Sequence, residues 1–121
     1  MGSARGTGAA WESVAEAHLQ QSGLRTLARN FVCRLGEIDL VMADRDCTVF
    51  VEVRFRHAAA HGGGVASVGA GKRAKLLRAA QVWLLAHPRR ASRACRFDVV
   101  GCSGTPQQPQ FDWIRNAFET C

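Results

Sequence analysis

The residues best suited to chemistry in this chain are two carboxylates, Asp39 and Glu52, each in a short segment whose apolar residues recur at every second position. Period-two alternation indicates β-strands, and in a hairpin the two acids can lie opposite each other. Directly opposed side chains are about 5 Å apart, and like charges placed there destabilise the sheet. Such a pair stays ionised when a cation binds beside it. The alternative is that these charges form the solvated face of the strands.

The hairpin that would bring the two acids together is predicted from residues 36–42 and 49–56, with a polar turn between them. A loop of two or four residues pairs residues whose numbers sum to 91. That register places Asp39 opposite Glu52 and Glu37 opposite Arg54. A loop of odd length would break this pairing.

Three motifs carry a resemblance to a known family: Gly-Glu-Ile-Asp-Leu at 36–40, Val-Phe-Val-Glu-Val-Arg-Phe-Arg at 49–56, and Arg-Phe-Asp-Val-Val at 96–100. They resemble the YraN family of uncharacterised bacterial proteins, which is similar to the Holliday-junction-resolvase branch of the PD-(D/E)xK nucleases. The resemblance extends over residues 11–118. It implies an α/β, restriction-endonuclease-like fold, in which a mixed β-sheet is flanked by α-helices.

The resemblance also implies roles for individual residues. Asp39 and Glu52, with Glu16 from an N-terminal helix, would hold Mg²⁺ or Mn²⁺, and Glu37 would lie among the catalytic residues. The superfamily pattern has a lysine two residues after the catalytic glutamate, where this chain has Arg54. Arginine does not give up its proton in a protein. Arg54 can therefore orient a water or hold phosphate charge, but it cannot act as a general base.

The distribution of charge favours a polyanionic partner. The formal net charge is +6, and every charged residue from 54 to 96 is basic, most of them arginine. A one-sided field beside a carboxylate cluster is typical of proteins that bind nucleic acid, although basic blocks are also common as plain solvated surface. We expect the nucleic acid to be DNA. The residues expected to contact its backbone are Arg56, Lys72, Arg73, Lys75 and Arg78.

From the sequence we expect one domain over residues 9–118, preceded by a flexible N-terminus at 1–8 and followed by a frayed end at 119–121. The expected elements are helices at 11–22 and 67–87, strands at 24–30 and 96–102, a turn at 103–110, a short strand at 111–114 and one helical turn at 115–118, in addition to the hairpin. We expect Asp98 to pair with a neighbouring arginine in a structural role.

Other features exclude several classes of site. The five cysteines include no Cys-x-x-Cys pair, which favours free thiols over a zinc site or a disulfide framework. No signal peptide or long apolar run is present, so we expect a cytoplasmic protein without a membrane partner. His57 and His61 belong to a glycine-rich loop that is better suited to closing over nucleic acid than to binding metal.

The leading hypothesis from the sequence is a metal-dependent, structure-selective endonuclease that hydrolyses phosphodiester bonds of branched DNA. One alternative is a nucleic-acid-binding module on the same fold without catalysis, and another is an interaction domain for an acidic protein. A two-fold homodimer is compatible with an enzyme that cuts two strands, but no heptad pattern argues for it.

Overall fold

The computed structural model describes the backbone of residues 3–55 and 69–118, and the side chains of residues 9–55 and 69–118. The elements in chain order are α1 (Ser3–Gln21), β1 (Arg25–Cys33), β2 (Gly36–Asp44), β3 (Cys47–Phe55), α2 (Ala70–Leu85), α3 (Pro88–Ala91), β4 (Cys95–Thr105) and β5 (Gln108–Phe118). Among these described helices, none is long and apolar enough to cross a membrane.

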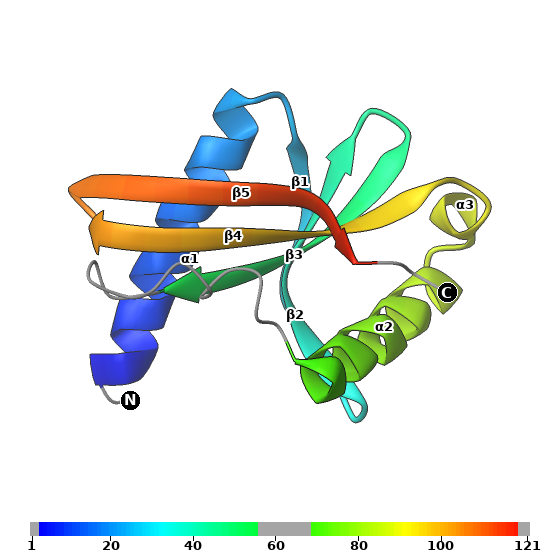
Figure 1. Ribbon diagram of the computed structural model, residues 1–121. Coiled ribbons are helices and arrows are strands. Elements are labelled where there is room, and N and C mark those ends of the chain that lie inside the picture. The colour runs from blue at the N-terminus through cyan, green and yellow to red at the C-terminus, as the bar shows by residue number, and fades with distance from the viewer. Residues whose placement is uncertain (1–2, 56–68, 119–121) are drawn as a thin grey trace.

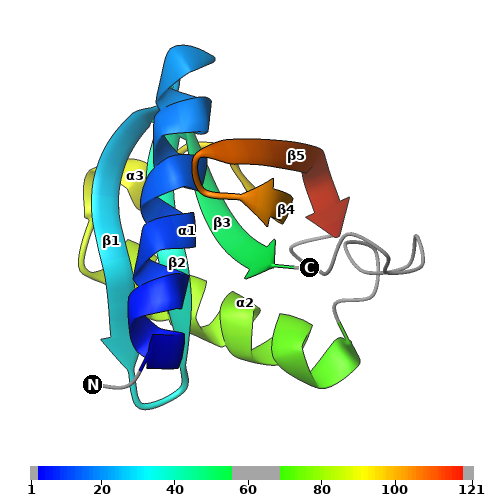
Figure 2. The same ribbon diagram turned by 90° about the vertical axis from the view of Figure 1, so that its left-hand side faces the viewer.

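The strands form one mixed sheet in the order β1-β2-β3-β4-β5. β3 and β4 are parallel and are joined through α2 and α3, whereas the other neighbouring strands are antiparallel. Helix α1 lies against one face of the sheet and α2 against the other (Figures 1 and 2). This architecture is the restriction-endonuclease-like sheet flanked by helices that the resemblance implied.

Each face of the sheet has its own apolar core, because the strands in the middle of the sheet are covered on both sides. On one face, Phe50 and Phe97 of the sheet stack with ring centroids 5.2 Å apart, and Trp83 of α2 packs edge-on against Phe50. On the other face, Trp11 and Leu19 of α1 pack on apolar residues of β2, β3 and β4. Both helices are thereby fixed relative to the strands that carry Asp39 and Glu52.

The predicted hairpin register is confirmed where β2 and β3 pair. The ladder runs from Asp44–Cys47 to Leu40–Val51, so paired residue numbers sum to 91, and the turn has two residues. Arg45 in this turn has φ 58°, as a tight two-residue hairpin requires. The ladder ends before the expected Asp39–Glu52 pair, so the two acids are close to each other but do not form a paired position.

Strand β2 parts from β3 beyond Leu40, and the irregularity is centred on Asp39. Ile38 packs in the core under α2 and Leu40 in the core under α1, although residues two apart in a regular strand share a face. On the neighbouring strand, Asn30 has φ 51°, a conformation that few non-glycine residues adopt. The expected pairing of Glu37 with Arg54 is therefore wrong: Glu37 pairs with Val32 of β1 instead.

Several element boundaries differ from the sequence prediction, among them the turn expected at 103–110, because β4 runs to Thr105 and β5 begins at Gln108. Helix α1 begins at Ser3, so part of the segment expected to precede it belongs to the helix. Strand β1 continues to Cys33. Residues 115–118, expected as a helical turn, extend β5, because this segment pairs with β4 as far as Phe97–Phe118. The pairing partner that decides this lies about twenty residues away in the sequence.

Candidate active site

Asp39 lies at the point where β2 and β3 separate. Its Oδ2 accepts a hydrogen bond of 2.8 Å from the backbone N–H of Val53. The carboxylate thus satisfies a β3 donor next to the end of the regular ladder, which closes at Leu40–Val51. A side chain held in this way has a fixed position between the two strands.

Glu52, the residue before Val53, is buried and faces α2. Lys72 in the first turns of α2 places its Nζ 3.3 Å from Oε2 of Glu52. The positive charge of Lys72 also lowers the pKa of Asp39, although burial outweighs it and the net pKa of Asp39 is raised. Lys72, expected only as a contact to the nucleic-acid backbone, therefore lies within the carboxylate cluster.

The structure does not bring Glu16 to this cluster. Its carboxylate is held by β1: Arg29 donates from Nε at 2.9 Å and approaches with Nη2 at 2.7 Å, and the hydroxyl of Thr26 donates to Oε2. Burial opposes the charge, but these hydrogen bonds outweigh it and hold the pKa of Glu16 below its usual value. The expected metal role of Glu16 is corrected to a clamp between α1 and β1.

Glu12, one helical turn before Glu16, takes the position next to Asp39. Partial burial, the charge of Asp39 and a hydrogen bond with it raise the pKa of Glu12 to about 7. Because residues four apart lie on the same side of a helix, the sequence placed both glutamates on one flank. It held no signal for which of the two meets β2, since that depends on where α1 crosses the sheet.

Asp39 raises the pKa of both of its acidic neighbours, Glu12 and Glu52. Burial and the charge of Asp39 raise the pKa of Glu52 to about 7, against the opposing charges of Lys72 and Arg54. The exposed Glu37 adds to the raised pKa of both Asp39 and Glu12. Grouped carboxylates of this kind favour either bound protons or a bound cation.

The donor set suits a magnesium-like ion that keeps several waters. Within the described residues, no group of three His, Cys, Asp or Glu side chains is gathered into a ready-made metal cage. Mg²⁺ is commonly held by one or two carboxylates, with waters and substrate oxygens completing its shell. Asp39 is anchored by a backbone N–H, and Glu52 is close enough for Asp39 to raise its pKa, so the two fit that smaller requirement.

The other residues predicted for the site differ in how they relate to the cluster. Arg54 is half-buried and close enough for its charge to lower the pKa of Glu52. Lys75 lines a hollow with Glu37 and Lys72, whereas Arg73 lines a separate hollow beside the end of β5. Arg78 is exposed on α2. Arg56, like His57 and His61, lies outside the described residues.

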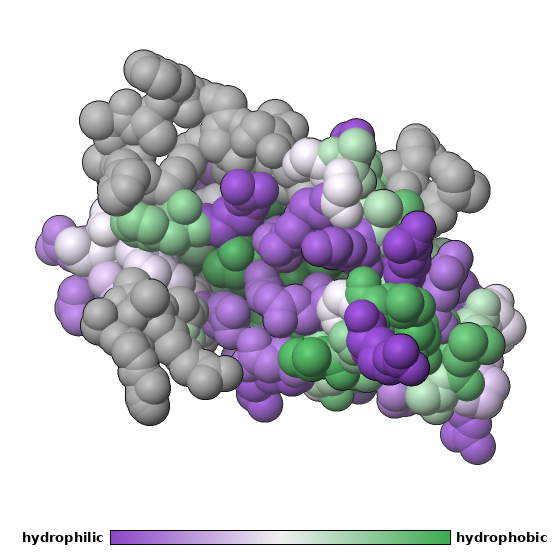
Figure 3. Space-filling model, turned by 90° about the horizontal axis from the view of Figure 1, so that it is seen from below, coloured by the Kyte–Doolittle hydropathy of each residue, from purple (hydrophilic) through white to green (hydrophobic). Residues whose placement is uncertain are grey.

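The lower end of the molecule in Figure 1 carries the start of α1, the β1–β2 turn and the start of α2, and the turn contacts α2 where Gly36 lies against Lys75. Viewed from that side, hydrophilic residues gather across the middle of the face, and apolar patches lie beside them (Figure 3). Of the groups described above, Glu37, Lys72 and Lys75 line one hollow.

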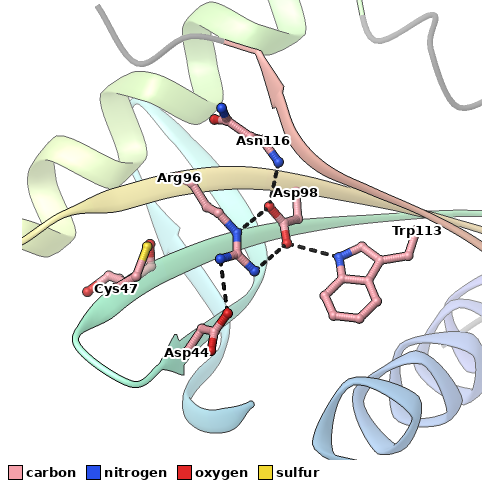
Figure 4. A network of polar contacts seen from close by, with 7 residues as sticks. Asp44, Cys47, Arg96, Asp98, Trp113 and Asn116 are labelled. Carbon is pink, nitrogen blue, oxygen red and sulfur yellow. Dashed lines mark hydrogen bonds and ion pairs between the residues drawn. The ribbon is translucent and has the colours of Figure 1, made fainter. Parts of the chain in front are cut away.

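Asp98 belongs to a different network on the sheet, as the sequence led us to expect. Arg96 donates to both of its oxygens at 3.0 and 3.2 Å, Trp113 Nε1 donates at 2.9 Å, and the backbone N–H of Asn116 donates at 2.9 Å (Figure 4). Arg96 also donates to Asp44 at 3.1 Å. With its oxygens occupied by protein donors, Asp98 ties β4 to β5 and has a structural role.

Comparison with known proteins identifies the family. The model of the uncharacterised protein family UPF0102 matches residues 11–102. A UPF0102 protein of Stutzerimonas stutzeri (strain A1501) is 50% identical over 120 residues, 99% of this chain and 100% of that protein. Another, of Xanthomonas campestris pv. campestris (strain B100), is 56% identical over 111 residues, 92% of this chain and 89% of that protein. The chain therefore belongs to the uncharacterised protein family UPF0102, the YraN family that its motifs resemble.

Proposed function

We propose that this protein is a metal-dependent endonuclease that hydrolyses phosphodiester bonds of branched DNA. The observation that supports this best is the fixed position of Asp39, whose carboxylate accepts the Val53 N–H where β2 and β3 part, beside Glu52 and Glu12. A group of carboxylates that includes the buried Glu52 and the partly buried Asp39 and Glu12 is costly for a purely structural site. Its place beside the basic residues of α2 favours a phosphate-containing substrate.

Asp39 and Glu52 are the residues that would hold the ion, Mg²⁺ or Mn²⁺. When bound, such an ion neutralises the non-bridging phosphate oxygens and polarises a water molecule. Glu12 replaces Glu16 as the third acidic residue of the site, because Glu16 is engaged by Arg29 and Thr26.

Hydrolysis joins the oxygen of a water molecule to phosphorus and breaks the bond from phosphorus to the leaving oxygen. One proton of the water must leave, and the leaving oxygen must gain a proton. Glu12, with a pKa of about 7, is suited to accept the first at neutral pH. Arg54 cannot do so. Lys72 supplies positive charge beside Glu52, where it can stabilise the charge that develops on the phosphate.

The flanking backbone of the substrate would lie along α2. Lys72, Arg73, Lys75 and Arg78 are all exposed on this helix. Lys72 and Arg73 lie in its first turns, where positive charge opposes the helix dipole and so adds nothing to helix stability. Contact with phosphates gives these charges a use, and we extend it to Arg56 on the basis of its charge alone.

The test is cleavage of labelled four-way-junction, flap, single-stranded and linear duplex DNA at low salt, with Mg²⁺, with Mn²⁺ and with chelator. We expect metal-dependent cutting of the branched DNAs that is lost in Glu52→Gln and Asp39→Asn. Asp46→Asn is the matched control, because Asp46 is an exposed acid in the β2–β3 turn, at the other end of the hairpin. Equal cutting by wild type and Glu52→Gln would refute the assignment of the site.

A second candidate, a nucleic-acid-binding module without catalysis, is favoured by one observation. The ion pair between Lys72 and Glu52 partly neutralises the cluster with a protein cation, and the usual lysine position holds Arg54. This candidate predicts DNA binding that weakens steeply with salt, together with no cutting under any metal condition. Binding that is unchanged in Glu52→Gln would complete that case.

A further inference from the structure

A hollow of about 350 Å³ adjoins the carboxylate cluster, between the β1–β2 turn and the start of α2. Glu37 and Lys72 line it on the side of the cluster, and Arg34, Lys75, Val32 and Leu35 form much of the rest. Val32 pairs with Glu37 in the β1–β2 ladder. Glu37 contributes to the raised pKa of Asp39, so the hollow borders the carboxylate cluster.

The turn that forms this wall is seated directly on α2. A Cβ at Gly36 would lie 2.7 Å from the backbone oxygen of Lys75, a distance that real side chains do not reach. Only glycine permits such a close approach of the turn to the helix backbone. The hollow is therefore bounded by two elements in fixed contact.

The lining combines two kinds of chemistry. Arg34, Lys72 and Lys75 offer positive charge suited to a phosphate. Val32 and Leu35 are 66% and 49% exposed, and they are two of the four exposed large apolar residues in the described part of the chain. Cationic and apolar groups side by side match a ligand with an anionic part and a flat apolar part.

We propose that this hollow is a subsite for one unpaired nucleotide next to the scissile phosphate. The inference rests on the proposed function, and it specifies which DNA the site selects. The phosphate of the nucleotide meets Arg34, Lys72 and Lys75, and its base covers Val32 and Leu35. The volume lies near the lower end of the range for small-ligand pockets, about 300 to 1,000 Å³, which suits a single nucleotide.

The subsite selects among DNA structures because a base must lose its stacking contacts before it can enter the hollow. In a paired duplex both faces of a base are stacked, and extruding it costs a few kcal/mol. At a flap, gap or junction the base is already unstacked, so contact with Val32 and Leu35 is gained at little cost. The subsite therefore favours DNA with an unpaired nucleotide over continuous duplex, without reading the identity of the base.

The test measures binding in chelator, so that cleavage does not interfere. Fluorescence anisotropy compares a duplex carrying a short single-stranded flap with a fully paired duplex of the same sequence. We expect wild type to bind the flap at least about tenfold more tightly. The double variant Val32→Ser/Leu35→Ser should lose most of that preference while its affinity for paired duplex stays within about twofold.

Two further variants separate the apolar and cationic parts. Leu85→Ser is the matched control, because Leu85 is 82% exposed on α2 and does not line the hollow; its preference should equal that of wild type. Lys75→Gln should weaken binding to both DNAs and lower the slope of log affinity against log salt by about one. Circular dichroism and thermal melting confirm that each variant is folded.

The outcomes distinguish this inference from the function on which it rests. Wild type that binds neither DNA contradicts both. Wild type that binds both DNAs equally, or a serine double variant that keeps the preference, overturns the subsite and leaves the proposed nuclease standing. A serine double variant that changes the molecular mass measured by light scattering overturns the subsite too, because Val32 and Leu35 would then belong to an interface between copies of this chain.

Discussion

Lys72 Nζ lies 3.3 Å from Oε2 of Glu52, so helix α2 brings an amine to the acid whose own strand carries Arg54 two residues later. The positive charge expected from β3 is thus accompanied by a lysine that comes from a different element. The charge of Lys72 also lowers the pKa of Asp39, against the larger effect of burial. It is the one described basic residue of α2 with an ion pair to the carboxylate cluster.

We predict that Lys72→Met lowers cleavage by about 100-fold or more, the usual effect of removing a group that stabilises transition-state charge. DNA affinity should fall only several-fold, as for the matched variant Lys75→Met, which should keep most of its cleavage rate. Arg54→Lys in the Lys72→Met background returns an amine to the site and should restore part of the rate. Single-turnover cleavage and anisotropy give the two quantities. Equal cleavage losses in Lys72→Met and Lys75→Met would mean that Lys72 only contacts the phosphate backbone of the DNA.

The raised pKa values of Glu12 and Glu52 predict how stability depends on pH in chelator. Both groups titrate near 4.5 when unfolded and near 7 when folded, so the folded protein binds more protons between these values. Their contribution to stability is therefore fully present below pH 4.5 and is lost as the pH rises through 7. Urea unfolding should give a lower free energy of unfolding at pH 8 than at pH 5, and added Mg²⁺ should recover part of the difference at pH 8.

Glu52→Gln isolates one of these groups. At pH 8 the variant should be more stable than wild type by about 1 to 2 kcal/mol, because it lacks the buried charge. At pH 4.5 the difference should shrink toward zero. Asp46→Asn, which removes an exposed charge, should change stability by less than about 0.5 kcal/mol. A Glu52→Gln protein that is less stable than wild type at pH 8 would show that the Lys72 ion pair outweighs the burial of Glu52.

Glu12 and Glu16 should respond in opposite ways to the same substitution. Glu16→Gln weakens the charged hydrogen bonds from Arg29 and Thr26, and we expect it to cost about 1 to 2 kcal/mol of stability. Glu12→Gln should leave stability at pH 8 equal or higher and should lower cleavage by about 100-fold, as for loss of a proton acceptor. If Glu16→Gln lowered cleavage and Glu12→Gln lowered stability instead, Glu16 would belong to the active site.

The Asp98 network predicts a large loss of stability without a direct effect on chemistry. Asp98→Ala leaves the donors of Arg96, Trp113 and Asn116 without their acceptor, and breaking a buried ion pair by removing one partner costs about 3 to 5 kcal/mol. The double variant Arg96→Met/Asp98→Ala should lose less than the sum of the two single variants. Additive losses in urea unfolding would mean that the two side chains act independently.

The sequence predicted those parts of the fold that local patterns determine. Alternation, with a turn of two or four residues, predicted the β2–β3 register, and that register led to Asp39 and Glu52. The sequence failed where distant elements decide. Which glutamate of α1 meets β2 depends on the crossing of helix and sheet, and the strand at 115–118 depends on its pairing with β4.

The position of Lys72 illustrates the same limit within the site. Its charge and its place near the start of a helix were evident, and they suggested contact with phosphate. Its approach to Glu52 depends on how α2 packs under the sheet through Leu76, Ala80 and Trp83. No pattern within α2 itself encodes that approach, because the partner acid lies twenty residues earlier, on β3.

The contact between the β1–β2 turn and α2 predicts opposite effects for two Gly→Ala substitutions. At Gly36 the new Cβ would lie 2.7 Å from the backbone oxygen of Lys75, so the turn must move away from the helix; overpacking of this kind costs about 1 to 3 kcal/mol. At Gly71, in the first turn of α2, a new Cβ has no atom within 4 Å, and alanine should stabilise the helix by about 0.5 to 1 kcal/mol.

Thermal melting shows whether each substitution raises or lowers stability. Flap binding shows whether the contact between the β1–β2 turn and α2 matters for the subsite. If the turn forms one wall of the nucleotide subsite, Gly36→Ala should also reduce the preference for flap over paired duplex, because Val32 and Leu35 move with the turn. Gly71→Ala adds a Cβ that has no atom within 4 Å, so it should leave that preference unchanged. A Gly36→Ala protein that loses stability but keeps the full preference would mean that the wall is not where the base binds.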